Sequence, residues 1–334
     1  MQIATAFDLF QTEVNADPTA VKEGRRRRDL FGDAFNPLDE VVRAIPSGAL
    51  ARRTQLDPIH DVDLIIEFVP TEHPDWGTPG RSAGDALTHV AGVVTDLLGV
   101  SSGAVAREVR RMLKRNHVVR CFLDDPDDPE IEYPFAVEVA PALRQADGTL
   151  LLPERYSSRW ITADPEDLIR RVGARQEAWS QFVPLVRVVK SWKNTRRLDA
   201  KSLVMEVLAL RCLPVDNRPR ALARFFTAAA SDVMGGVFDP AGHCGEIQPD
   251  LDRSHLRERL LAAGDLASRA LAAEAAGDLD RAVCLWRQLF GPTFPEPPSG
   301  CPDRSASAIG DHTATLTGAA VGAPRRRIRD IPQG

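Results

Sequence analysis

The sequence predicts an α+β fold in which a mixed β-sheet with flanking helices is followed by a lobe built from helices. The clearest strand pattern lies at residues 61–69, where apolar and polar side chains alternate. Two further segments, at residues 117–123 and 133–140, are rich in β-forming residues and flank a turn-forming stretch. From residue 164 to residue 290 the apolar spacing is helical and strand signals nearly vanish. Strands followed by helices along one chain are typical of α+β proteins.

The composition is that of an ordinary globular protein. Apolar residues make up 43% and charged residues 27% of the 334 residues, which excludes a disordered or fibrous chain and allows two lobes. No apolar run approaches the ~20 residues that cross a bilayer, and the first residues lack a signal-peptide pattern. We therefore expect a cytoplasmic protein without membrane contact. The net charge of −5 does not attract polyanions, so no stable nucleic-acid binding is expected.

Five cysteines are spread along the chain: Cys121, Cys212, Cys244, Cys284 and Cys301. Their odd number and wide spacing fit neither a disulfide framework nor a zinc ribbon, so we expect reduced thiols. The adjacent pair His243-Cys244 offers two metal ligands, but no second pair with zinc spacing follows it.

The first 45 residues are predicted to be helical. Apolar side chains recur at helical spacing over residues 7–14, and a second helical segment carries consecutive arginines at residues 25–28. Such a basic run is more typical of a solvated helix face than of a nucleic-acid contact. Asn36-Pro37 has the order of a cap and a first-turn proline, which predicts a third helix over residues 38–45.

The strand at residues 61–69 is followed by a helix and a hairpin. Apolar residues between Ser82 and Gly99 recur at three- and four-residue steps, and the glycine suits a helix end. The two β-rich segments are joined by the acidic, proline-containing stretch 124–129. We therefore expect these segments to pair as antiparallel strands.

Helices are predicted throughout the second half. Asp164 suits a cap and Pro165 a first helical position, and Pro184 is expected to interrupt this stretch before a separate helix. Apolar spacing predicts further helices at residues 201–212, 218–230, 252–276 and 279–290. Residues 296–334 are rich in Pro, Ser, Gly, Ala and Thr and have no apolar face, which predicts a disordered tail.

Three carboxylates of the predicted sheet form the candidate site. Asp61 and Asp63 lie two residues apart on one strand, so they face the same way with Cα atoms roughly 6.5 to 7 Å apart. Such a pair can hold two Mg²⁺ ions for a phosphoryl displacement. Glu138, on the opposite face from its apolar neighbours, is the candidate third ligand and needs a cationic partner. The alternative is a chance D-x-D pair and a Glu138 that only pairs with an arginine.

The segments around these carboxylates resemble a known family. The stretch from Ser47 to Thr54, followed by Asp61 and Asp63, resembles the G-S-x-x-x-G-T and D-x-D signature of the nucleotidyltransferase superfamily that includes DNA polymerase beta. Later segments match in the same order: Val137 to Ala142, Arg159 to Pro165, Leu185 to Asn194, Lys201 to Glu206 and Ala282 to Gly291. Together they resemble the branch of cyclic GMP-AMP synthase and oligoadenylate synthetase, particularly the bacterial CD-NTases of CBASS anti-phage defence.

The resemblance implies a polymerase-beta-like core with a mixed sheet and a C-terminal helical lobe. The nucleotidyltransferase lobe would comprise residues 1–153 and the helical lobe, closing over nucleotide, residues 154–295. The implied activity is Mg²⁺-dependent synthesis of a cyclic di- or trinucleotide from NTPs, and the product would act on a CBASS effector. Asp61, Asp63 and Glu138 would bind two Mg²⁺ ions, with Mn²⁺ as an alternative. Nucleotide and phosphate contacts are implied for Ser47, Gly48, Ala49, Arg53, Thr54, Lys190, Ser202 and Leu203.

Four residues depart from the family pattern. Ala49 replaces a phosphate-binding serine, Glu138 an aspartate, and Leu203 a frequent base-stacking tyrosine. Arg53 takes the place of the motif's second glycine and adds a cation. These departures leave open a catalytically impaired nucleotide-binding member. A second alternative keeps the chemistry but changes the acceptor, as in a nucleotidyltransferase that modifies tRNA or protein.

The tail ends at Gly334. A free C-terminal glycine is what an E1/E2-like conjugating enzyme can capture, and some CBASS operons encode such an enzyme. The alternative is an ordinary frayed terminus.

Overall fold

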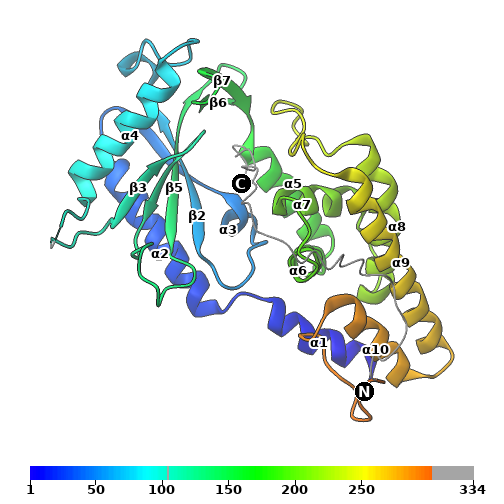
Figure 1. Cartoon of the computed structure of the whole chain (residues 1–334). Coiled ribbons are helices and arrows are strands. Elements are labelled where there is room, and N and C mark those ends of the chain that lie inside the picture. Colours follow the sequence, from blue (N-terminus) through cyan, green and yellow to red (C-terminus); the bar gives the residue numbers. More distant parts are fainter. Residues whose placement is uncertain (104, 303–334) are drawn as a thin grey trace, which may run out of the picture.

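A mixed sheet forms the centre of the first lobe (Figure 1). The computed structural model describes residues 1–103 and 105–302. Within them the strand order is β1-β2-β5-β4-β3, with β6 pairing with β5 and β7 with β6. The strands are β1 (Val41–Ser47), β2 (Asp61–Phe68), β3 (Arg111–Lys114), β4 (Val119–Phe122), β5 (Ala136–Arg144), β6 (Leu150–Glu154) and β7 (Arg159–Ala163). The predicted α+β class is therefore confirmed.

The pairing of β2 with β5 is parallel, whereas the other strand pairs are antiparallel. Asp63 on β2 is the register partner of Glu138 on β5, and Glu138 is in turn opposite Arg120 on β4. The antiparallel pairing predicted for the two β-rich segments is the β4–β5 pair. This register brings the candidate carboxylates of two strands together.

Helices α2 and α4 share an apolar core with the sheet, and the later helices form a second lobe beside it (Figure 1). The first-lobe helices are α2 (Pro18–Phe35), α3 (Gly48–Arg52), the 3-10 turn η1 (Pro70–Glu72) and α4 (Ser82–Leu98). The later ones are α5 (Pro165–Ala178), α6 (Phe182–Thr195), α7 (Ser202–Cys212), α8 (Arg218–Asp232), η2 (Val233–Gly235), α9 (Arg253–Ala275) and α10 (Leu279–Phe290). Each helix predicted between residues 82 and 290 is present, but the break expected at Pro184 lies earlier: α5 ends at Ala178, and Pro184 is in the first turn of α6. None of the described helices has both the length and the apolar character that spanning a bilayer requires.

The N-terminal helix α1 (Ile3–Val14) belongs to the helical core, although it begins the chain. Figure 1 shows it lying beside α10, away from the sheet. The ring of Phe7 packs edge-on against Trp286, with 5.0 Å between ring centroids, and against Phe294 at 5.3 Å. The helical lobe therefore closes its core with a segment that precedes the first lobe in the sequence.

The prediction of a helix over residues 38–45 is wrong, because this segment enters β1. Val41 and Ile45 are buried β-branched residues, which pack well on a pleated surface. Asn36 ends α2 instead of starting a helix. Its Oδ1 accepts a hydrogen bond of 2.8 Å from the backbone N–H of Ala44, which fixes β1 against the end of α2.

The sequence patterns also did not predict the short helix α3 or the short strands β3, β6 and β7. β3, β6 and β7 are four or five residues long, too short for an alternating pattern to stand out. The predicted lobe division between residues 153 and 154 lies inside β6, and the sheet itself runs on to Ala163. The division stays a prediction.

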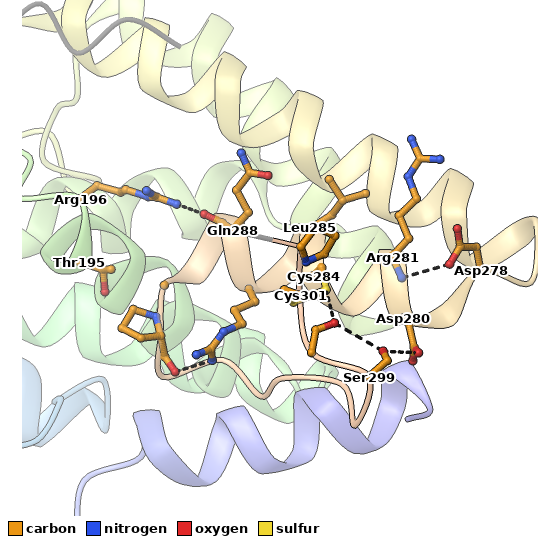
Figure 2. Close-up of a pocket in the computed structure, with 15 residues that line it drawn as sticks. Thr195, Arg196, Asp278, Asp280, Arg281, Cys284, Leu285, Gln288, Ser299 and Cys301 are labelled. Atoms are coloured by element: carbon orange, nitrogen blue, oxygen red, sulfur yellow. Dashed lines mark hydrogen bonds between the residues drawn. A yellow bond between two sulfur atoms is a disulfide. The ribbon is translucent and has the colours of Figure 1, made fainter. Parts of the chain in front are cut away.

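The expectation of reduced thiols is wrong for two cysteines, because Cys284 on α10 and Cys301 form a disulfide (Figure 2). Cys121, Cys212 and Cys244 are free. Near the disulfide, the hydroxyl of Ser299 donates a hydrogen bond of 2.5 Å to Asp280, so the segment up to residue 302 is attached to α10. It borders a cavity of about 930 Å³ that Figure 2 shows between α10 and this segment. The remainder of the predicted tail, residues 303–334 with Gly334, lies outside the described residues.

Candidate active site

The three candidate carboxylates lie on two neighbouring strands. Asp61 and Asp63 share one face of β2 and Glu138 lies beside Asp63 on β5. The expected cationic partner is Arg120 on β4, whose Nη1 donates a hydrogen bond of 3.0 Å to Oε1 of Glu138. Its Nη2 also lies 4.0 Å from Oδ2 of Asp61. One guanidinium thus faces two of the carboxylates, which leaves the cluster with an excess of negative charge.

The charge state of Asp63 reflects this crowding. Burial and the negative charge of Asp61 raise the pKa of Asp63 to about 6, although Arg52 and Arg120 act in the opposite direction. In a cluster of carboxylates, each negative charge disfavours the ionised form of its neighbours, and a divalent cation bound by their oxygens removes this repulsion. The residues present therefore fit a metal site of the kind expected from the sequence.

Gly48, at the start of α3, is required by the position of Asp63. Its φ of +68° is in the left-handed region, which favours glycine. A Cβ atom added to it would lie 1.6 Å from Oδ2 of Asp63. The turn from β1 into α3 therefore passes so close to the Asp63 carboxylate that a side chain at residue 48 would collide with it.

Two neighbouring arginines at the end of α3 have different surroundings. Arg53 has a φ of 61° and an exposed side chain, and its carbonyl accepts hydrogen bonds of 2.9 and 2.6 Å from Arg187 on α6. Arg52, by contrast, is 4% exposed. Arg52 lines the cavity beside the carboxylates, next in sequence to the Arg53 that the motif indicates.

A cavity of about 350 Å³ lies between the two lobes at these residues. Predicted site residues that line it are Ala49, Asp61, Asp63, Glu138, Lys190, Ser202 and Leu203. Ser47 and Thr54 are buried, and the carbonyl of Thr54 accepts a hydrogen bond from Lys190. Lining residues that sequence reasoning missed include Arg52, Gln55, His60, His117, Asn194, Lys201 and Glu206. The cavity therefore draws its walls from α3, β2 and β5 on one side and α6 and α7 on the other.

Glu206 on α7 joins two buried cations at the wall of this cavity. Its Oε2 accepts a hydrogen bond of 2.8 Å from Nε of Arg52, and its Oε1 accepts one of 2.7 Å from Nζ of Lys190. Burial alone would raise the pKa of Glu206, but Arg52 and Lys190 hold it down at about 2. A single acid within the apolar segment 203–209 was the available sequence signal for this cluster.

Comparisons with known proteins show what the chain resembles in sequence and in fold. No family model matches the chain. It is 26% identical, over 89% of its length and 93% of the relative, to the cyclic AMP-AMP-GMP synthase of Enterobacter hormaechei subsp. hoffmannii (strain UCI 50). It is 24% identical, over 87% of its length and 97% of the relative, to a probable cyclic nucleotide synthase of Bacillus cereus (strain VD146).

Solved structures of CD-NTases share the fold. The structure of CdnC from E. coli MS115-1 with ATP has a TM-score of 0.67 at 17% identity and covers 88% of this chain and 99% of its own. CdnG from Bradyrhizobium diazoefficiens, in complex with GTP, has a TM-score of 0.63 at 12% identity and covers 86% and 94%. The resemblance predicted from the motifs is confirmed: the chain has the CD-NTase fold and is related to cyclic nucleotide synthases.

Proposed function

We propose that this protein is a divalent-metal-dependent nucleotidyltransferase that joins NTPs into a cyclic di- or trinucleotide second messenger of CBASS defence. The observation that carries the proposal is the set Asp61, Asp63 and Glu138, gathered on two parallel strands at a cavity between the lobes. The relatives in sequence, which are cyclic nucleotide synthases, support the same activity.

In this proposal Asp61, Asp63 and Glu138 hold two Mg²⁺ ions, or Mn²⁺ ions with the same preference for oxygen. Bound ions of this kind lower the pKa of an attacking hydroxyl and neutralise charge on the transferring phosphoryl group. The chain's own part is to position the carboxylates: Arg120 orients Glu138, and Gly48 leaves space for Asp63. A 2′- or 3′-hydroxyl of one nucleotide would then attack the α-phosphorus of another: the new O–P bond forms as the bond to the α,β-bridging oxygen breaks, pyrophosphate leaves, and the hydroxyl proton passes to solvent. A further such step on the linear product closes the ring.

The nucleotide would lie in the cavity, with its phosphates toward the α3 turn and the start of α7. Ser202 is the first residue of α7, where backbone N–H groups and a hydroxyl favour an anion. Ala49 offers no hydroxyl, so one phosphate contact of the family pattern is missing, and the buried Leu203 supplies an apolar wall instead of a stacking ring. The proposed nucleotide and phosphate contacts remain Ser47, Gly48, Ala49, Arg53, Thr54, Lys190, Ser202 and Leu203.

The test is product analysis with the full-length protein. Incubation with all four labelled NTPs and Mg²⁺, followed by phosphatase, chromatography and mass spectrometry, should yield a small phosphatase-resistant product. The variant carrying Asp61→Asn and Asp63→Asn should yield none, whereas Asp96→Asn, an exposed acid on α4, should match the parent. Label on added tRNA or protein would instead support the macromolecule-modifying alternative.

Partners follow from the same proposal. The product would act on a CBASS effector, and an E1/E2-like enzyme would conjugate the chain through Gly334. Deleting Gly334 should abolish covalent adducts in cells and spare the activity of purified protein; adducts that persist would refute conjugation at this residue. The chain is similar in fold to CdnC, which was solved in complex with a HORMA protein. The same cellular experiment should therefore also look for a protein that binds this chain.

A further inference from the structure

A cluster of two histidines and one glutamate lies away from the proposed catalytic centre. Glu40 directly precedes β1, His73 follows η1, and His89 lies in α4. Their ligand atoms all lie within 4.8 Å of one another. The ring of His73 packs edge-on against Phe68 at the far end of β2, with 5.2 Å between centroids. Since Asp61 begins β2 seven residues earlier, the cluster is roughly 23 Å along the strand from this carboxylate.

The two imidazoles converge on opposite oxygens of one carboxylate. Nε2 of His73 lies 3.2 Å from Oε2 of Glu40, and Nε2 of His89 lies 2.9 Å from Oε1. Ligand atoms on a tetrahedral Zn²⁺ ion lie about 3.3 Å apart, because the bonds are about 2.0–2.1 Å long. The contacts of His73 and His89 with Glu40, the second of them a hydrogen bond, are thus close to this spacing, and the two imidazole nitrogens lie within 4.8 Å of each other.

His73 is fixed in place with its donor atom poorly satisfied. Its side chain is 10% exposed and stacks on Trp76, with ring centroids 3.9 Å apart and planes inclined by 16°. Nε2 is buried and has no assigned hydrogen bond within the described part of the chain, although Oε2 of Glu40 lies 3.2 Å away. A buried polar atom without a hydrogen bond is costly. A cation between this nitrogen and Glu40 would satisfy both groups.

We propose that Glu40, His73 and His89 form a binding site for one Zn²⁺ ion. Two imidazole nitrogens and one carboxylate oxygen are a donor set that zinc takes in proteins, with water in the fourth position. The ion would connect three segments that are distant in sequence: the start of β1, the turn after β2 and the middle of α4. Its function would be to stabilise the end of the sheet that lies far from the catalytic carboxylates.

The experiment uses the full-length protein without an affinity tag, stripped with EDTA and titrated with Zn²⁺ in excess Mg²⁺. Asp61→Asn and Asp63→Asn are present throughout, so that zinc does not bind at the catalytic carboxylates. We expect one Zn²⁺ per chain by equilibrium dialysis and a higher thermal unfolding midpoint with zinc. His89→Ala, on a partly exposed helix position, should weaken binding at least about tenfold and abolish the midpoint shift. Glu40→Gln, which keeps the side-chain shape, should also weaken it.

The matched control is His255→Ala, an exposed histidine at the start of α9, which should bind zinc like the parent. Absence of stoichiometric zinc, or unchanged affinity in both His89→Ala and Glu40→Gln, would overturn the proposal. Replacing zinc by Co²⁺ tests the location. A spectrum with thiolate charge-transfer absorption would place the ion at a cysteine such as Cys244 and would also overturn it, whereas nitrogen and oxygen ligation lost in His89→Ala supports the site.

Discussion

Replacing Glu206 with glutamine should destabilise this protein strongly while hardly changing its shape. The Glu206 carboxylate accepts hydrogen bonds from Arg52 at 2.8 Å and from Lys190 at 2.7 Å, and all three side chains are nearly fully buried. Removing its charge leaves two cations close together in a region of low dielectric. Breaking a buried ion pair by removing one partner costs about 3–5 kcal/mol.

The pKa of Glu206 gives an independent magnitude. Burial opposes ionisation, but Arg52 and Lys190 lower the pKa from 4.5 to about 2. At about 1.4 kcal/mol for each pH unit, this difference corresponds to about 3–4 kcal/mol of stability. Because the pKa is lower in the folded state, this stability is fully present above pH 4.5 and is lost as the pH falls toward 2. We therefore expect a loss of about 3–4 kcal/mol at pH 7 that shrinks below about pH 5.

Urea unfolding of the full-length chain at pH 7 and at pH 3 measures both quantities. Glu258→Gln, an exposed acid on α9, is the matched control and should stay within about 0.5 kcal/mol of the parent. A Glu206→Gln variant within about 1 kcal/mol of the parent at pH 7 would refute the reasoning. An equal loss at both pH values would refute its electrostatic origin.

Two further predictions concern backbone space and the disulfide. Gly48→Ala should reduce product formation at least about a hundredfold, because its Cβ would displace the Asp63 carboxylate. Gly84→Ala is the control and should be active, because an added Cβ there meets nothing within 4 Å. Equal losses of activity in the two variants would contradict the steric cause. Reduction should lower the free energy of unfolding by about 3 kcal/mol, since the bond between Cys284 and Cys301 closes a 17-residue separation. Thermal unfolding with and without dithiothreitol measures this, and Cys284→Ser should show no dependence on reductant; a parent protein indifferent to reductant would argue against the bond.

The sequence was most informative where a short repeat of apolar and polar residues determines the local structure. Alternation in β2 places Asp61 and Asp63 on one face. Burial of the Glu138 carboxylate is costly without a cation nearby, so a cationic partner could be predicted, and in the structure it is Arg120. The pattern was less informative in β1, because the spacing of Val41 and Ile45 fits both a strand face and a helix face. In the folded chain the backbone N–H of Ala44 donates a hydrogen bond to Asn36, a contact that this spacing does not reveal.

Contacts between distant segments could not be predicted in this way. Arg52 and Glu206 are 154 residues apart, and their pairing depends on how α7 packs against α3. Cys284 and Cys301 likewise meet only because the chain turns back along α10 after Gly291. Pairings of this kind follow from tertiary packing, whereas a motif reports only which residue types a family uses at each position.

The family resemblance and the structure give Lys190 different partners. The family resemblance assigns it to the donor triphosphate, yet its ammonium already donates hydrogen bonds to Glu206 and to the carbonyl of Thr54. An ammonium has three N–H donors, so a third can still reach a phosphate in the adjoining cavity without breaking either bond. If Lys190 binds phosphate, Lys190→Met should raise the KM for NTPs far more than Glu206→Gln does, because the glutamine variant keeps the cation. If the two variants raise KM equally, Lys190 acts only by supporting the wall of the cavity.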